Sequence, residues 1–261
     1  MPPVDDVRTG ELMNRQLLEL LGERARPLVV AELCSNAAPY DRATIEKFTA
    51  LADLAGCAAV KLQYWRADHF PREERDRKRP YELPDGALAD LVMLAHSYDM
   101  LAGASVFEAV DVSMLLDARV DFIKLAAREC KNHLLLTTAA TSKLPVLRSI
   151  VWDGVSLGPE AHKYGCLPLA CVTHYPARVK PLDMVALRGV PMPWGWSSHS
   201  GNGLDCVTAA ALGAVVVEFH LKTADSEPEA PWSLTATEAG AVVRLCQEVA
   251  GTGGKQSEQA S

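Results

Sequence analysis

The chain has 261 residues, of which 49% are hydrophobic and 23% charged, and its formal net charge is −7. This composition is typical of a globular protein with a sizeable core, and the negative charge argues against a nucleic-acid partner. The sequence shows no signal peptide and no apolar run near the roughly 18 residues that a membrane span needs, so we expect no membrane partner. The length suits one large α/β barrel or two ordinary domains.

Eight short apolar segments run through the chain and predict parallel strands that are buried on both faces. In chain order they are Leu28–Leu33, Ala58–Gln63, Leu101–Val106, Phe122–Ala126, Val146–Ile150, Leu167–Val172, Trp194–Ser197 and Val215–Phe219. Segments that can be helical follow them: Asp41–Leu54, Leu88–Tyr98, Val110–Leu116, His133–Thr138, Gly158–Lys163, Pro181–Leu187, Leu204–Ala211 and Thr237–Val249.

A β/α unit about every 30 residues, repeated eight times, predicts a (β/α)8 TIM barrel, an α/β fold. We expect it to form a single domain over residues 28–250. A doubly wound open sheet is the competing fold, but the residues after the first strand, Leu33–Pro39, lack its glycine-rich fingerprint.

Three segments lie outside the repeating units. Residues 1–27 form a predicted N-terminal helical extension with an amphipathic helix over Glu11–Leu21, and residues 251–261 are a polar tail that we expect to be disordered. Arg66–Gly86 is expected to be a long charged loop, and such loops often act as lids or partner contacts.

The seven cysteines form no CxxC pair and several lie inside apolar runs, which predicts reduced, mostly buried thiols in a cytoplasmic protein. They are Cys34, Cys57, Cys130, Cys166, Cys171, Cys206 and Cys246.

Lys61 and Lys124 each interrupt an apolar strand. A buried lysine needs an anionic partner or a lowered pKa, and one such lysine could be a Schiff-base nucleophile. Two of them, with serines at neighbouring strand ends, favour a cradle for a small dianion or trianion. The alternative is that each pairs internally with a carboxylate from the set Glu32, Glu129 and Glu218.

His199 and His220 follow the last two predicted strands, so both should lie on the same rim of the barrel. Two imidazoles at adjacent strand ends predict a divalent-metal site. His174, at the end of the sixth strand, is a weaker third candidate.

Nine short motifs resemble, in order, those of the sialic acid synthase family. They are Ala31–Asn36, Val60–Gln63, Ser105–Glu108, Lys124–Ala127, Pro145–Ser149, Cys171–Pro176, Gly195–His199, Ala211–Ala214 with Glu218–His220, and Ser233–Leu234. Each motif is weak alone, but nine in order at strand ends are specific for the family. The resemblance implies a TIM-barrel transferase that condenses phosphoenolpyruvate with an aldehyde sugar, giving a 3-deoxy-2-ulosonic acid and phosphate.

The resemblance and the strand-end positions assign roles to fourteen residues. The expected catalytic residues are Lys61, Lys124, Glu32 and Tyr175; the expected substrate-binding residues are Gln63, Ser105, Arg128, Glu129, Ser149, Thr173, Ser197 and Glu229; the expected metal ligands are His199 and His220. The implied cofactor is a divalent metal, typically Mn²⁺, with Mg²⁺, Co²⁺ or Zn²⁺ as alternatives.

Several positions depart from the family pattern and predict an altered acceptor. Ala37, Ala127 and Ser198 replace an expected histidine, serine and aspartate, and we expect the family's C-terminal antifreeze-like domain to be missing. Arg128 could replace the lost phosphate contact, whereas Arg148 should face the surrounding helices. We expect a homodimer, and a separate antifreeze-like domain protein is a candidate partner. The alternative function is a noncatalytic, partner-dependent member that binds or assembles.

Overall fold

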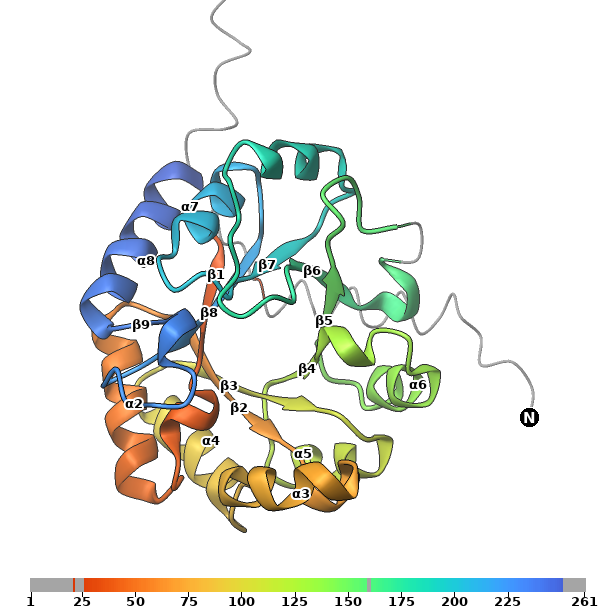
Figure 1. Cartoon of the computed structure of the whole chain (residues 1–261), viewed down its shortest axis with the longest axis vertical. Coiled ribbons are helices and arrows are strands. Elements are labelled where there is room, and N and C mark those ends of the chain that lie inside the picture. The colour runs from red at the N-terminus through yellow and green to blue at the C-terminus, as the bar shows by residue number, and fades with distance from the viewer. Residues whose placement is uncertain (1–20, 22–25, 159–160, 251–261) are drawn as a thin grey trace, which may run out of the picture.

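The computed structural model describes residue 21 and residues 26–158 and 161–250. The expected helix Glu11–Leu21 and the expected disordered tail 251–261 lie outside the described residues, apart from Leu21 itself. The part of the chain that is described forms a closed (β/α)8 barrel, which confirms the predicted fold class (Figure 1).

All strand pairings in the barrel are parallel, and β1 pairs with both β2 and β8, which closes the sheet. The strands are β1 (Leu28–Glu32), β2 (Ala59–Tyr64), β3 (Leu101–Val106), β4 (Phe122–Leu125), β5 (Val146–Val151), β6 (Leu167–Cys171), β7 (Gly195–Ser197) and β8 (Val216–Leu221), followed by a two-residue β9 (Ser233–Leu234) against β8. The strands β1 to β8 each lie within two residues of the bounds expected from the apolar runs, and β9 was not expected.

The helices surround the strands in Figure 1. They are α2 (Arg42–Leu54), α3 (Arg72–Lys78), α4 (Ala87–Ser97), α5 (Val112–Asp117), α6 (His133–Thr141), α7 (Leu204–Ala211) and α8 (Ala236–Ala250). Three begin at side-chain caps. Asp41 accepts from the Thr44 N–H at 2.7 Å before α2, and Asn132 accepts from the Leu135 N–H at 3.2 Å before α6. Thr235 and Glu238 form a reciprocal capping box before α8.

Three sequence predictions need correction. The expected helix Pro181–Leu187 is a 3-10 helix, η7 (Asp183–Gly189). The described part of Gly158–Lys163 holds no α-helix; a short 3-10 turn, η6 (Lys163–Gly165), begins at its last residue. The expected loop Arg66–Gly86 contains α3 between the 3-10 helices η2 (Ala67–His69) and η3 (Arg79–Tyr81). Charge-rich helices of one or two turns have no apolar face, so hydrophobic periodicity cannot reveal them.

The interior of the barrel changes from apolar to polar along the strands. Because successive strand residues point to opposite faces, residues two apart share a face. Leu28 and Val30 thus share a face with Glu32, and Val216 shares one with Glu218 and His220. The earlier positions belong to one apolar cluster that also contains Ala59, Phe122, Leu147, Leu167 and Leu169. The chain therefore fills the floor of the barrel with hydrocarbon and leaves charged groups at the carboxyl ends of its strands.

No helix among the described residues is both long and apolar enough to cross a bilayer.

Candidate active site

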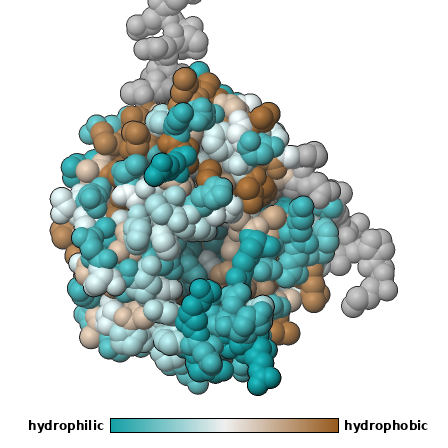
Figure 2. All heavy atoms as spheres, in the orientation of Figure 1, coloured by the Kyte–Doolittle hydropathy of each residue, from teal (hydrophilic) through white to brown (hydrophobic). Residues whose placement is uncertain are grey.

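A cavity of about 510 Å³ opens at the carboxyl ends of the strands, and Figure 2 shows the hollow at the centre of this face. It is lined by thirteen of the fourteen predicted site residues: Glu32, Lys61, Gln63, Ser105, Lys124, Arg128, Ser149, Thr173, Tyr175, Ser197, His199, His220 and Glu229. The fourteenth, Glu129, is not in the lining; its carboxylate lies 3.2 Å from Arg128 Nε and accepts from Asn132 Nδ2 at 3.1 Å.

Strand register brings these side chains together. Glu32 is aligned with Lys61 on one side and with His220 on the other. Ser197 is aligned with Glu218 on β7 and β8. Parallel strands that end at one rim therefore place residues from distant parts of the sequence within contact distance.

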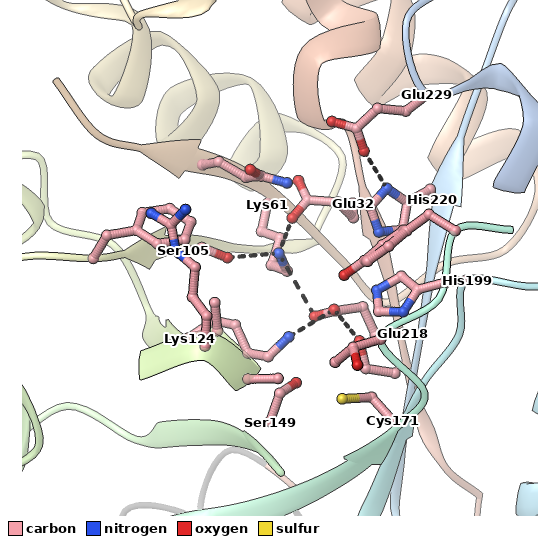
Figure 3. Close-up of a pocket in the computed structure, with 18 of the residues that line it drawn as sticks. Glu32, Lys61, Ser105, Lys124, Ser149, Cys171, His199, Glu218, His220 and Glu229 are labelled. Atoms are coloured by element: carbon pink, nitrogen blue, oxygen red, sulfur yellow. Dashed lines mark hydrogen bonds and ion pairs between the residues drawn. The ribbon is translucent and has the colours of Figure 1, made fainter. Parts of the chain in front are cut away.

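The two buried lysines are paired with two buried glutamates. Lys61 Nζ donates to the Glu32 carboxylate and, at 2.8 Å, to Ser105 Oγ, and it lies 3.7 Å from Glu218 Oε2. Lys124 Nζ donates to Glu218 Oε1 at 2.7 Å, and Ser197 Oγ donates to the same oxygen at 2.8 Å. Figure 3 shows this network across the pocket floor. The internal pairing considered above as the alternative is thus present for both lysines.

Electrostatics keep the Glu218 carboxylate ionised. Burial alone would raise the pKa of Glu218, but Lys124 and Lys61 hold that pKa well below its usual range. Burial lowers the pKa of Lys61 to about 7, and the Glu218 carboxylate opposes that shift. Each ammonium group has three N–H donors, so Lys124 keeps donors for a ligand while it contacts Glu218.

The two histidines lie side by side at the ends of β7 and β8, with ring centroids 5.2 Å apart. His199 Nδ1 lies 2.9 Å from the Val172 carbonyl oxygen, which can only accept, so this nitrogen carries the proton. His220 Nδ1 lies 2.8 Å from Glu229 Oε2. Burial, and secondarily His220, lower the pKa of His199 to about 3, so the ring is neutral at pH 7 and its Nε2 has a free lone pair.

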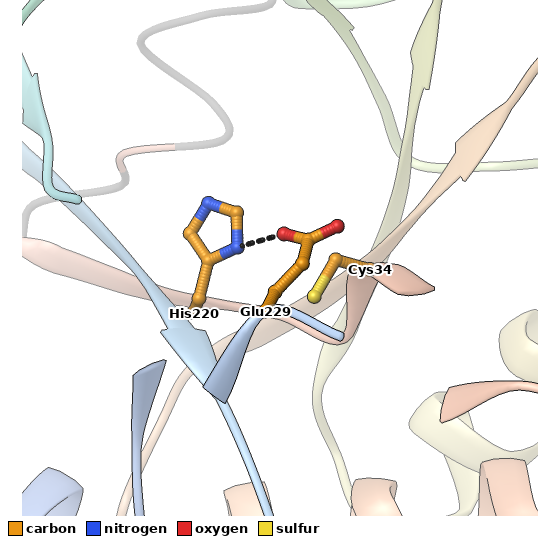
Figure 4. Close-up of side chains that lie close together, drawn as sticks. All are labelled: Cys34, His220 and Glu229. Carbon is orange, nitrogen blue, oxygen red and sulfur yellow. Dashed lines mark ion pairs between the residues drawn. The ribbon is translucent and has the colours of Figure 1, made fainter. Parts of the chain in front are cut away.

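A second possible ligand group shares His220. Cys34, His220 and Glu229 offer atoms that all lie within 4.8 Å of one another (Figure 4), and no other such group occurs in the described part of the chain. Burial and the neighbouring Glu229 raise the pKa of the Cys34 thiol well above its usual range, so the sulfur is protonated. The sequence prediction overlooked Cys34, which lies beyond the end of β1 in the 3-10 turn η1 (Cys34–Ala37).

The two imidazoles, His199 and His220, are oriented as ligands of a divalent cation usually are. Imidazoles that ligate a metal are usually oriented by a carboxylate or carbonyl on their other nitrogen, as His220 is by Glu229 and His199 by Val172. The Nε2 atoms of the two rings are then the nitrogens left for a cation.

A buried carboxylate holds the turn that carries His199. Asp205, at the start of α7, accepts from Trp196 Nε1 at 2.9 Å, from Ser198 Oγ at 2.9 Å and from Ser200 Oγ at 2.7 Å. Ser198, one of the family departures, therefore faces Asp205, and Asp205 contacts the residues on both sides of His199 through Ser198 and Ser200.

Aromatic rings form one wall of the cavity. The Tyr175 ring lies 4.3 Å from His199 and 5.4 Å from Trp232, centroid to centroid. Tyr175 is half exposed, and burial of its hydroxyl raises its pKa to about 12, so the phenol stays protonated and can donate a hydrogen bond. The sequence prediction included Tyr175 but overlooked Trp232.

Sequence reasoning missed several other lining residues. Glu218 was named only as a possible internal partner of the buried lysines and was not assigned to the site, although the two-residue spacing to His220 indicates a shared face. The lining also includes Trp65, Phe70, Lys78, Phe107 and Cys171. Arg148 is buried and its Nη2 donates to the Cys130 carbonyl; it does not line the cavity, consistent with the expectation that it points away from Ser149.

The fold and the rim of ionised groups define a TIM barrel with a site at the carboxyl ends of its strands. The model of the NeuB family matches residues 48–258, and the chain belongs to this family. It is 26% identical over 234 residues to a pseudaminic acid synthase from Helicobacter pylori, covering 77% of this chain and 68% of that protein. It is 25% identical over 249 residues to one from Campylobacter jejuni, covering 82% and 71%.

Among solved structures, an N-acetylneuraminic acid (sialic acid) synthetase from Leptospira borgpetersenii superposes with a TM-score of 0.77 and 21% identity. The match covers 90% of this chain and 89% of that one and shows that the two share the barrel fold.

Proposed function

We propose that this chain condenses phosphoenolpyruvate with an aldehyde acceptor. In the reaction, C3 of phosphoenolpyruvate bonds to the aldehyde carbon, whose oxygen takes up a proton. Water adds at C2, and phosphate leaves. The observation that carries the proposal is the pair of buried ammonium groups, Lys61 and Lys124, at the floor of a cavity lined by serines.

The lysines and serines would hold phosphoenolpyruvate. Lys61 and Lys124 would contact its carboxylate and phosphate, with Ser105, Ser149 and Ser197 donating hydrogen bonds. Buried, pre-oriented donors stabilise developing charge more effectively than water does, because they need no reorganisation. They would also fix C3 against the acceptor, which lowers the entropic part of the barrier.

Charge balance supports a divalent cofactor. The cavity lining contains four cationic side chains and three carboxylates, one net positive charge, against a ligand that carries about three negative charges. We propose that His199 and His220 hold the cation, with Mn²⁺ the first metal to test. When bound, such a cation supplies Lewis acidity that polarises the acceptor carbonyl.

Other residues of the site have supporting roles in this proposal. Glu32 orients Lys61, and Glu229 orients His220. Gln63, Thr173 and Tyr175 would face the acceptor with groups that can donate or accept hydrogen bonds. The family comparison supports a sugar-like acceptor, since the relatives' names describe synthases of pseudaminic and N-acetylneuraminic acids.

One observation favours the alternative, noncatalytic function. Both buried lysines already contact carboxylates, so the barrel floor is neutralised without a ligand, as it would be in a noncatalytic family member that binds or assembles. That protein could still bind phosphoenolpyruvate, but it would not release phosphate from it.

The test is phosphate release from phosphoenolpyruvate with Mn²⁺ and a panel of aldoses and simple aldehydes, with mass spectrometry of the product. The proposal expects phosphate and a product whose mass is acceptor plus pyruvate. Binding of phosphoenolpyruvate with no phosphate release from any acceptor would support the noncatalytic function instead.

We also propose a homodimer, which sedimentation velocity would test, and a separate antifreeze-like domain protein as a candidate partner. A reducing, cytoplasmic setting suits the seven cysteines, all of which are free thiols.

A further inference from the structure

A small aromatic cluster at the mouth of the cavity stands apart from the main core. Trp65, Phe70 and Phe107 form it, with the Trp65 and Phe70 rings 5.2 Å apart, edge to face. Phe70 belongs to the segment between β2 and α4 that contains α3. Figure 2 shows strongly hydrophilic side chains gathered over α3 beside the hollow. This segment therefore contributes directly to the cavity wall.

Two cations rest on these rings. Arg128 Cζ lies 4.9 Å from the centre of the Phe70 ring and 4.4 Å from that of Phe107. Lys78 Nζ, from the end of α3, lies 5.0 Å from the centre of Phe70 and 5.8 Å from that of Trp65. Both line the cavity. Phe70 thus holds two positive charges, from separate elements, at the same opening.

One of the two charges, that of Lys78, has no carboxylate partner among the described residues. Lys78 Nζ has no carboxylate oxygen within 4.0 Å among the described residues, and Arg128 pairs with its sequence neighbour Glu129. Burial and then repulsion from Arg128 lower the pKa of Lys78. Repulsion between two like charges is tolerated where cation–π contacts offset it, and an anion would remove it.

The alternative explanation is that Lys78 and Arg128 pack their aliphatic carbons against the rings while their charged groups stay in water. The rest of the segment argues against it for Lys78. Its neighbours Arg75, Arg77 and Arg79 each have a carboxylate oxygen within 4.0 Å. Lys78 lacks such a partner, and unlike them it lines the cavity.

We propose that the acceptor carries an anionic group, a phosphate or a carboxylate, at the end remote from its aldehyde, and that Lys78 and Arg128 bind it. This inference rests on the proposed condensation. The cavity then has two anion-binding ends. Lys61 and Lys124 on the buried floor, with side-chain exposures of 2% and 5%, would serve phosphoenolpyruvate, and the mouth pair would serve the acceptor.

One alternative source of the anion is phosphoenolpyruvate itself, whose phosphate could reach the mouth. Two measurements separate these sources. Calorimetry gives the affinity for phosphoenolpyruvate alone, with Mn²⁺ present, and the affinity of the phosphoenolpyruvate-loaded protein for arabinose 5-phosphate, mannose 6-phosphate and glucuronate. Kinetics then compare each with arabinose, mannose or glucose, which lack the anionic group.

The variants are Lys78→Met and Arg128→Met, with Arg77→Met as the matched control on the same helix. We expect at least one anionic sugar to bind the wild type at least tenfold more tightly than its neutral counterpart. Lys78→Met should weaken that binding, and raise KM, about tenfold, while kcat, phosphoenolpyruvate affinity and neutral-sugar binding change less than twofold. Arg77→Met should match the wild type.

Equal affinity for anionic and neutral sugars would overturn the inference. So would a Lys78→Met variant that loses phosphoenolpyruvate affinity and keeps its sugar discrimination, because the anion at the mouth would then be phosphoenolpyruvate. If the protein binds anionic sugars in a Lys78-dependent way but never releases phosphate, the binding site stands and the condensation proposal fails.

Discussion

Lys124 and Glu218 meet inside the barrel, with Nζ and Oε1 2.7 Å apart, although they lie on β4 and β8, which are not neighbours in the sheet. Ser197 donates to the same oxygen, and Lys61 lies 3.7 Å from the other one. A single carboxylate thus links both ammonium groups of the cavity floor. The Glu218 carboxylate fixes the positions of the two ammonium groups that a ligand would contact. Loss of its charge should therefore lower the stability of the protein.

Glu218→Gln should destabilise the protein strongly. Removal of one partner of a buried pair leaves uncompensated charge, at a cost of about 3–5 kcal/mol. Urea denaturation at pH 7, followed by tryptophan fluorescence, measures the loss, and the exposed Glu248→Gln should fall within about 0.5 kcal/mol of the wild type. A Glu218→Gln variant that matches this control would show that the pairing contributes little.

Metal binding should require both histidines. His199→Ala and His220→Ala should each abolish stoichiometric Mn²⁺ binding, measured by electron paramagnetic resonance of the free ion. Unchanged metal content in the double variant would exclude this site.

Cys34→Ser separates the two ligand groups that share His220. Because the Nε2 atoms of His199 and His220 are the proposed ligands, we expect Co²⁺ to bind without a sulfur-to-cobalt charge-transfer band, and Cys34→Ser to bind Co²⁺ as the wild type does. A near-ultraviolet band that disappears in Cys34→Ser would place the metal on Cys34, His220 and Glu229 instead.

The free energy of unfolding should depend on pH through His199. The pKa of His199 is about 3 in the folded protein, below the usual value of 6.5. Between these two pH values the unfolded chain is protonated at His199 and the folded protein is not. Stability is therefore lost as pH falls from 6.5 towards 3, by about 2 kcal/mol at pH 5. In EDTA, His199→Asn should lose less stability than the wild type between pH 7 and 5. The exposed His174→Asn should show the wild-type slope, and an equal slope in His199→Asn would contradict the shift.

The segment that carries α3 should be needed for turnover. It supplies Phe70 and Lys78 to the cavity, and catalysis of this kind requires that water be kept from the reacting enol. Replacement of residues 72–81 by a short Gly-Ser linker should lower phosphate release with the best acceptor at least tenfold. A shortened protein as active as its parent would show that this segment does not close the site.

The barrel and most of its rim could be predicted from sequence because both depend on local patterns. Continuous apolar runs mark strands buried on both faces, and charged residues inside such runs, as at Lys61 and Lys124, point to the site. Lys78 could not be found in this way. Lys78 lies in a run of charged residues that sequence alone does not distinguish, and its position depends on how α3 packs against Phe70. Cys34 was likewise hidden, because its proximity to Glu229 joins segments almost two hundred residues apart.

The most direct test of the account is a calorimetric titration of phosphoenolpyruvate into the Mn²⁺-loaded protein. We expect one saturable site per chain in the wild type and in the exposed control Lys180→Met. A charge-assisted contact contributes about 1.5–3 kcal/mol, so Lys124→Met should bind at least roughly tenfold more weakly, with an unchanged near-ultraviolet circular dichroism spectrum to show that it is folded. Absence of binding to the folded, metal-loaded wild type would contradict the proposed function.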